Sequence, residues 1–159
     1  TPALVAAEEN KSKALQMLLQ ARANIDKAGE DGTTPVLAAV HNLSREALAM
    51  LLDARADANT EDGQGQTPVL VAAQKNNSKA LQMLLKAWTY VDKSAEDGAT
   101  PLLAAVHNLS REALAMLLDA RAEKKTRARL FRCCFRPGPI STRRGKMGRR
   151  LFLQRSTIS

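Results

Sequence analysis

Apolar and polar positions along this chain repeat with a period of 33 residues. A Thr-Pro pair starts each period and opens a short apolar stretch rich in Ala, Leu and Val. A second apolar stretch follows about ten residues later and ends in Leu-Leu. A fixed period of this length is typical of an architecture built from stacked repeats. The four pairs are Thr1-Pro2, Thr34-Pro35, Thr67-Pro68 and Thr100-Pro101.

Each period predicts two short antiparallel helices followed by a turn. The hydroxyl of Thr34 can cap a first helix whose first position is Pro35, where a missing N–H costs nothing. Ser44 can cap a second helix over residues 45–53, in which leucines recur at helical spacing. Asp-Gly pairs supply the positive φ angle that a tight turn needs. We therefore expect helices to start at each Thr-Pro pair and near Ser12, Ser44, Ser78 and Ser110.

A single pair of such short helices cannot bury its apolar face, so the copies must stack. A coiled coil would need unbroken heptads, whereas Pro, Asn and Asp-Gly interrupt this chain every dozen residues or so. The period-two alternation of a β-solenoid is also absent from the sequence. The pattern therefore predicts an all-α solenoid of stacked helix-turn-helix units. Its expected core is Leu4, Leu15, Leu18, Leu37, Leu48, Leu51, Leu70, Leu81, Leu84, Leu103, Leu114 and Leu117.

The repeated unit resembles the ankyrin repeat. Residues 1–7 and 67–73 match Thr-Pro-x-Leu-x-Ala-Ala, and residues 55–59 read Arg-Ala-Asp-Ala-Asn where the family has Gly-Ala-Asp-Val-Asn. The resemblance covers residues 1–123, as repeats at 1–33, 34–66, 67–99 and 100–123. It implies a non-catalytic protein–protein interaction module, an ankyrin-type scaffold or adaptor whose partner is another protein.

Departures from the family pattern predict a stack of modest stability. The turn-ordering His that the family places after Thr-Pro-Leu is Leu in all four repeats. The Gly between the two helices is Asn10, Leu43, Asn76 or Leu109, and Leu disfavours the left-handed conformation that this turn requires. The Gly after the second helix is Arg or Trp.

A second period, of 66 residues, is superimposed on the first. Residues 41–56 are identical to residues 107–122, and residues 12–19 are identical to residues 78–85. The duplicated unit is therefore a pair of repeats. Such near-identity indicates an array that grows by copying.

Charge divides the 159-residue chain into two parts. Residues 1–123 carry 16 acidic and 12 basic side chains, a net charge of −4, whereas residues 124–159 carry 12 basic side chains and no acidic one. Cys133 and Cys134 are adjacent and form no disulfide framework, which favours an intracellular location, cytoplasmic or nuclear. The chain begins at Thr1 with neither a Met nor a charged leader, so we expect a fragment or a processed chain.

The basic tail, residues 124–159, leaves several interpretations open. It can bind an acidic partner, nucleic acid or an anionic membrane, by neutralising phosphates. Two short basic runs resemble nuclear-import signals, and the cysteine pair beside Phe131 and Phe135 resembles a palmitoylation site. The tail can also be out-of-frame translation, because its Arg-, Gly- and Pro-rich composition abandons that of the repeats. We expect it to be mostly irregular, with a short helix at residues 127–136.

No constellation in the sequence is typical of catalysis. His41 and His107 occupy the same position of two repeats that are separated by a third, too far apart to share one ion. Paired carboxylates lie on expected turns, where solvent surrounds them, and no Gly-rich phosphate loop or calcium loop is present. We expect no enzyme activity, no cofactor, no metal and no small-molecule substrate. One alternative is that the array is the docking arm of a larger enzyme whose catalytic domain lies outside this fragment.

The resemblance also implies which residues contact a partner. In ankyrin repeats the turn tips and the exposed side of the first helix form a concave surface. That surface is polar and tends to be acidic here, and it lacks aromatic anchors. Carried over by position, the candidate partner contacts are Glu8, Glu9, Glu30, Asp31, His41, Asn42, Glu61, Gln64, Gln66, Gln74, Lys75, Glu96, Asp97, His107 and Asn108.

The last repeat poses a separate problem, because terminal repeats of a solenoid need a polar outer face. The fourth repeat copies the second, an internal one, so its outer face should expose apolar area, including parts of Leu114 and Leu117. One hypothesis is that residues 127–136 form a capping helix whose covered face consists of Leu130, Phe131, Cys134 and Phe135. The alternative is that the tail leaves this end free to pair with another copy or with lost repeats.

Overall fold

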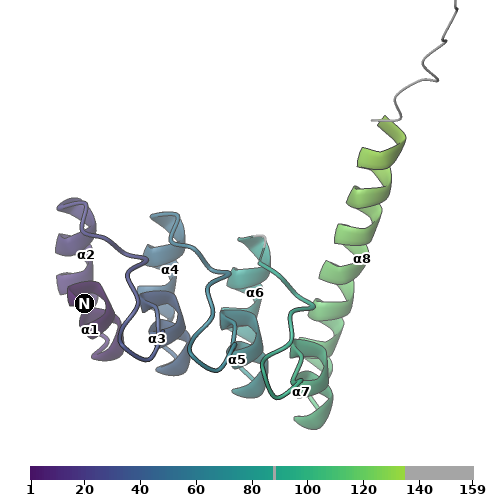
Figure 1. Ribbon diagram of the computed structural model, residues 1–159, viewed down its shortest axis with the longest axis horizontal. Coiled ribbons are helices and arrows are strands. Elements are labelled where there is room, and N and C mark those ends of the chain that lie inside the picture. The colour runs from purple at the N-terminus through teal and green to yellow at the C-terminus, as the bar shows by residue number, and fades with distance from the viewer. Residues whose placement is uncertain (88, 135–159) are drawn as a thin grey trace, which may run out of the picture.

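The computed structural model describes residues 1–87 and 89–134, with side chains up to Thr126. This part of the chain contains eight helices and no strand, which confirms the all-α repeat solenoid. First helices and second helices form two parallel rows, joined by loops that lead from one repeat to the next (Figure 1). The helices are α1 Pro2–Glu8, α2 Ser12–Gln20, α3 Pro35–His41, α4 Arg45–Asp53, α5 Pro68–Gln74, α6 Ser78–Lys86, α7 Pro101–His107 and α8 Arg111–Cys134.

The first helix of every repeat begins as the sequence predicts. A threonine hydroxyl accepts a hydrogen bond from the backbone N–H three residues on, and Pro follows the threonine as the first helical residue. In repeat two the Leu37 N–H donates to Thr34 Oγ1 at 3.4 Å, and in repeat four the Leu103 N–H donates to Thr100 Oγ1 at 3.2 Å. Each cap satisfies an N–H that has no partner within the helix.

Caps of the second helices follow the prediction only in part. Ser110 Oγ accepts a 3.4 Å hydrogen bond from the Ala113 N–H, as a capping serine should. The prediction is wrong for Ser44, whose hydroxyl is buried and has no hydrogen-bond partner in the described part of the chain. In repeats one and three the serines are the first helical residues, and Lys11 and Asn77 precede them at the cap position.

The turns between the helices adopt the left-handed conformation that the family pattern implies. Leu43 has φ 56° and Leu109 has φ 52°, close to the 51° and 52° of Asn10 and Asn76. Asn tolerates this region because its short polar side chain can bond locally, whereas Leu gains nothing there. Two of the four turns therefore hold a residue that disfavours their backbone conformation.

A continuous core of leucine, valine and alanine runs between the two rows of helices. Of the expected core leucines, Leu18 and Leu114 are half-buried, and Leu103 is 57% exposed, which corrects its assignment to the core. The equivalent Leu37 and Leu70 are completely buried, because a following repeat covers them. Leu103 belongs to the last repeat and has no such cover in the described part of the chain.

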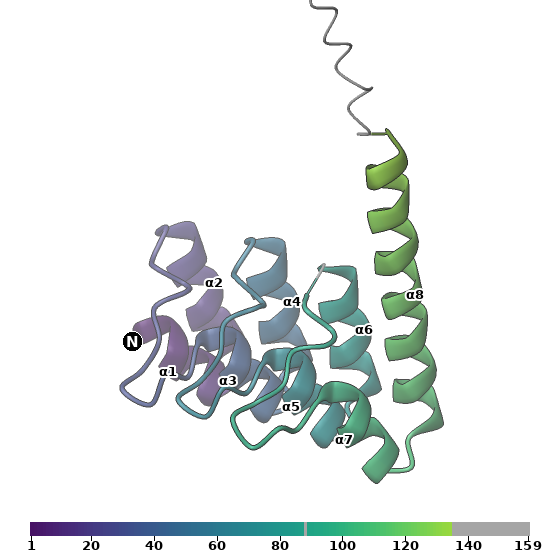
Figure 2. The same ribbon diagram turned by 45° about the vertical axis from the view of Figure 1, so that its right-hand side comes forward.

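Helix α8 departs from the other second helices because it continues for 24 residues. It passes the expected boundary at residue 123 without interruption and includes residues 127–134 of the predicted tail helix. It runs past the ends of α2, α4 and α6 in both views rather than folding back over α7 (Figures 1 and 2). The described part of the tail therefore does not form the proposed cap. Residues 135–159, including Arg136 and the part expected to be irregular, lie outside the described residues.

Lys124 joins the extended part of α8 to the preceding repeat. Its Nζ donates to the carbonyl oxygen of Thr89 and lies 5.5 Å from the centroid of the Tyr90 ring, a cation–π geometry. Partial burial lowers the pKa of Lys124, and Asp92 opposes that shift. None of the described helices is both long and apolar enough to cross a membrane.

Candidate functional site

A groove of about 640 Å³ lies between repeats one and two, and we call it the acidic groove. The end of α1, one side of α3 and the loops that precede α3 and α5 form its walls. Three carboxylates face it, together with amides, one imidazole and one hydroxyl. Its lining residues are Glu8, Asp31, Thr33, Ala38, His41, Asn42, Asp62, Gln64 and Gln66.

Local hydrogen bonds fix the first loop carboxylate of the groove. Asp31 Oδ2 accepts a 2.6 Å bond from the Thr33 hydroxyl, and Asp31 Oδ1 accepts a 3.0 Å bond from the Thr33 N–H. These bonds hold the pKa of Asp31 below its ordinary value of 3.8, so the carboxylate is ionised at neutral pH. A fixed and ionised carboxylate is suited to binding a cation rather than to donating a proton.

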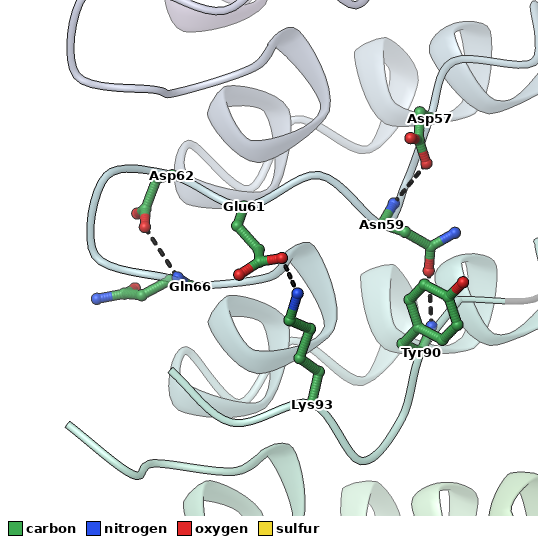
Figure 3. A network of polar contacts seen from close by, with 7 residues as sticks. All are labelled: Asp57, Asn59, Glu61, Asp62, Gln66, Tyr90 and Lys93. Carbon is green, nitrogen blue, oxygen red and sulfur yellow. Dashed lines mark hydrogen bonds and ion pairs between the residues drawn. The ribbon is translucent and has the colours of Figure 1, made fainter. Parts of the chain in front are cut away.

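The second loop is tied to itself and to the first loop. Asp62 Oδ1 accepts a 2.9 Å bond from the Gln66 N–H (Figure 3). It accepts a second 2.9 Å bond from the Gln64 N–H. The Gly63 N–H donates to the carbonyl oxygen of Asp31 at 2.9 Å, which links the two loops. Gly32 has φ 80°, and a Cβ there would lie 2.7 Å from the Gly63 nitrogen, so only glycine fits. The loops thus present their carboxylates from a fixed backbone.

His41 and Asn42 line the floor of the acidic groove from the end of α3. Partial loss of hydration and the nearby Lys75 lower the pKa of His41, and Asp62 opposes them. Asn42 Nδ2 donates a 2.9 Å bond to the carbonyl oxygen of Glu8, so this amide joins repeat two to repeat one. Lowering the pKa keeps the imidazole neutral and able to accept as well as donate a hydrogen bond at neutral pH.

A smaller hollow of about 260 Å³ occupies the equivalent place between repeats three and four. Gln74 replaces Glu8, Ala99 replaces Thr33, and Asp97, the counterpart of Asp31, is not among the lining residues, so this hollow has no carboxylate in its lining. Asn108 Nδ2 donates to the carbonyl oxygens of Ala73 at 3.0 Å and Gln74 at 2.8 Å, repeating the joint made by Asn42. His107 and Leu103 also line it. The 66-residue duplication thus yields two related hollows, of which one is acidic.

The structure divides the sequence-predicted contact residues among several places. Glu8, Asp31, His41, Asn42, Gln64 and Gln66 meet in the acidic groove, and Gln74, His107 and Asn108 meet in the smaller hollow. Two others form ion pairs outside both: Glu9 with Lys11, and Glu61 with Lys93 of the next repeat (Figure 3). The remaining four are exposed and line neither hollow: Glu30, Lys75, Glu96 and Asp97.

Asp62 also lines the acidic groove, although the sequence pattern did not place it among the candidate contacts. A signal for Asp62 exists in the sequence. The second repeat reads Asp-Gly-Gln-Gly at residues 62–65, so its turn aspartate lies two positions earlier, relative to the next Thr-Pro, than an Asp31-type aspartate. That shift turns a carboxylate expected at the tip into one that faces the groove.

Side chains that could hold a metal do not gather in the described part of the chain. No group of three or more His, Cys, Asp or Glu residues there has the geometry to hold an ion. The two loop carboxylates of the groove, Asp31 and Asp62, accept hydrogen bonds from their own loops. The arrangement can bind cationic and hydrogen-bonding groups of a partner surface.

Comparisons with known proteins agree with the fold. A family model described as ankyrin repeats in many copies matches residues 3–52, and one described as ankyrin repeats in three copies matches residues 50–128. No curated protein matches the chain.

Proposed function

The chain belongs to the ankyrin-repeat family, whose repeats form protein–protein interaction modules, and we propose that it is a non-catalytic scaffold or adaptor that binds its partner in the acidic groove. The observation that carries the proposal is the set of three carboxylates on the groove walls, Glu8, Asp31 and Asp62, of which hydrogen bonds within the loops fix Asp31 and Asp62. We propose that the partner offers a Lys- or Arg-bearing segment, because such groups pair with carboxylates and donate to the amide oxygens beside them.

The groove supports a weak and salt-dependent interaction. Exposed ion pairs each contribute little to affinity, about 0.2–1 kcal/mol, and salt screens them. The lining holds no aromatic side chain that could serve as a buried anchor. The fixed loops offset part of this weakness, because a preorganised site loses less conformational entropy when the partner binds. Such a module selects its partner by charge and holds it reversibly.

Peptide binding tests this proposal. Fluorescence polarisation would compare a pool of Lys/Arg-bearing peptides with a pool in which Gln replaces every basic residue, because the basic tail, residues 124–159, would itself attract acidic peptides. We expect the basic pool to bind the chain more tightly and its affinity to fall as salt rises. Equal binding of the two pools, or binding of the basic pool that is indifferent to salt, would refute the acidic groove as the partner site.

A matched pair of variants locates the binding. Glu8→Gln removes a groove carboxylate and makes this position resemble Gln74 of the smaller hollow. Glu9→Gln removes the adjacent carboxylate, which pairs with Lys11 outside the groove. We expect Glu8→Gln to weaken binding by up to about fivefold and Glu9→Gln to leave it unchanged. Equal effects of the two variants would place the peptide elsewhere.

A further inference from the structure

The last repeat carries an apolar face that the other repeats bury. Leu103, Val106 and Leu118 are 57%, 51% and 47% exposed. Their counterparts in repeat two, Leu37 and Val40, are completely buried, and Leu52 is half-buried. The last repeat thus exposes three large apolar side chains on α7 and α8, and exposed apolar side chains that gather on one face mark interaction sites.

The packing of repeat three on repeat two shows what kind of surface fits this face. Residues 37–56 of repeat two are identical to residues 103–122 of repeat four. In repeat two these side chains lie against α5 and α6 of repeat three. The outward face of repeat four therefore has the same side chains as the face of repeat two on which α5 and α6 pack. A helix pair with the side chains of α5 and α6 would fit it.

Helices α1 and α2 carry the same contact side chains as α5 and α6. Residues 12–19 are identical to residues 78–85, and Val5 corresponds to Val71. Val71 is fully buried and Met83 is half-buried in the stack. Val5 and Met17, their counterparts in repeat one, are 46% and 69% exposed. The exposed side of α1 and α2 in a second copy of this chain is therefore a surface on which the outward face of repeat four can pack.

We propose that two copies of the chain associate head to tail, with α7 and the first turns of α8 of one copy packed against α1 and α2 of the other. The contact repeats the packing of repeat two on repeat three. Because the two surfaces differ, each copy keeps one free face after pairing, and further copies can add to either end.

The contact between copies is weaker than its internal template. Between repeats two and three the Tyr90 N–H donates to Asn59 Oδ1 at 2.7 Å, and Lys93 pairs with Glu61 (Figure 3). The positions 66 residues beyond Asn59 and Glu61 lie within α8, so the loop that supplies both contacts is missing there. Only the helix packing is conserved. Association is therefore reversible and depends on concentration.

Extended helix α8 leaves the face open. Its extended part runs past the ends of α2, α4 and α6 and away from α7 (Figures 1 and 2). A neighbouring α2 would lie beside the first turns of α8, as α6 lies beside α4.

Sedimentation of the full chain over a range of concentrations tests the proposal. We expect the weight-average mass of the wild type to rise with concentration. Leu103→Glu should weaken association about tenfold or more, because a charge replaces an apolar contact. The matched control is Leu109→Asn, which removes a leucine that is 87% exposed in the turn, away from the face, and introduces the residue found in repeats one and three. It should associate like the wild type. A wild type that stays monomeric, or an equal effect of both variants, overturns the proposal.

Mixing two variants that are each altered on a different face tests whether the copies associate head to tail. Met17→Glu removes the opposite face, so it should also be monomeric alone. A mixture of Leu103→Glu with Met17→Glu retains one intact pair of faces, so we expect a 1:1 dimer that does not grow further. If Met17→Glu still dimerises like the wild type while Leu103→Glu does not, the face pairs with itself and the proposal is wrong. Unchanged circular dichroism melting of each variant shows that both exposed positions tolerate the charge.

Discussion

Repeats two and four share 20 consecutive residues, 37–56 and 103–122, and yet they differ in structure. In repeat two the second helix ends at Asp53 and Arg55 turns to φ 63°, whereas in repeat four the equivalent Arg121 lies inside α8. Leu37 is completely buried and Leu103 is largely exposed. Neither difference arises within the identical segment. Neighbouring repeats decide burial, and the residues immediately after the segment decide where the helix ends.

The first difference after the shared segment accounts for the longer helix. Asp57 Oδ1 accepts a 2.9 Å bond from the Asn59 N–H, which turns the chain, and Asn59 in turn accepts from the Tyr90 N–H. Repeat four has Glu123 and Lys125 at these positions. Both are good helix formers and neither closes such a short side-chain-to-backbone turn. The helix therefore continues where repeat two turns.

The largest expected effect comes from truncating the same leucine in the two repeats. Leu37→Ala should lower the free energy of unfolding by about 2–5 kcal/mol, because it leaves a cavity in a fully packed site. Leu103→Ala should cost at most about 1 kcal/mol, since much of that side chain already contacts solvent. Urea unfolding followed by circular dichroism measures both. Equal losses would show that repeat four is covered in solution.

A second test converts the end of repeat four into that of repeat two. Glu123→Asp, Lys124→Ala and Lys125→Asn together should end α8 near residue 121. A helical segment of about a dozen residues cut off in this way is marginal alone. We expect up to about half of the 24-residue helix to be lost from the far-UV circular dichroism signal. The control triple Glu123→Gln, Lys124→Arg and Lys125→Arg keeps helix-forming residues and should keep the signal. If the first triple also keeps it, the local turn does not explain the difference.

Replacing the leucines that have a positive φ angle should change the free energy of unfolding by a smaller amount, and should raise it. Leu109→Gly should raise the free energy of unfolding by about 0.5–1 kcal/mol, because glycine adopts φ 52° without the Cβ clash. Leu43→Gly should gain less, since Leu43 is 58% exposed against 87% for Leu109 and loses some packing. Thermal and urea denaturation measure both. Ala115→Gly, in an exposed helical position, is the control and should cost about 1 kcal/mol. A loss at residue 109 would contradict the strain argument.

How far the sequence predicts the structure can be judged from these pairs of residues. Period, helix starts and left-handed turns depend on residues close in sequence, and they were predictable: Thr34 caps its helix and Leu43 takes a positive φ. The exposure of Leu103 depends on whether a following repeat covers it, and the length of α8 depends on the residues that follow the shared segment. Neither can be predicted from the pattern within one repeat. In the candidate site, positions on α1 and α3 were predictable from the repeat. Asp62 was missed, because the repeat pattern shows its two-residue shift within the loop but not that the shift moves its carboxylate into the groove.

Two serines at the same position of repeats two and four give a further contrast. Ser110→Ala removes a 3.4 Å capping bond and should cost about 0.5 kcal/mol, at the low end for a helix cap. Ser44→Ala removes a buried hydroxyl that has no hydrogen-bond partner among the described residues, so stability should stay the same or rise slightly. The two variants differ only in the repeat, and thermal melting in one buffer compares them. A larger loss for Ser44→Ala would mean that its hydroxyl does have a partner.

The smallest expected effect concerns the pKa of His41, which the charges of Lys75 and Asp62 shift in opposite directions. Loss of hydration and Lys75 lower its pKa from the ordinary 6.5, and Asp62 opposes them. We therefore expect Lys75→Gln to raise the pKa of His41 and Asp62→Asn to lower it further, each by removing one charge. Lys86→Gln, which changes a lysine at the end of α6 away from the groove, is the control. Imidazole NMR titration in a His107→Gln background follows His41 alone. A shift of the same sign in all three variants would rule out these local charges.

The same pKa shift has a consequence for stability. The unfolded chain protonates His41 near its ordinary pKa, whereas the folded chain does so only at lower pH. Between these two values the unfolded state binds the extra proton, so the contribution of His41 to stability is present above about pH 6.5 and is lost as pH falls through the folded-state pKa. Replacing His41 by Gln should therefore flatten the loss of stability below pH 6.5, measured by urea unfolding at a series of pH values. Lys75→Gln should flatten it in part, because it removes one of the two causes of the shift. An unchanged pH profile in both variants would assign the acid sensitivity of the stack to its carboxylates, of which Asp31 loses its contribution only below pH 3.8.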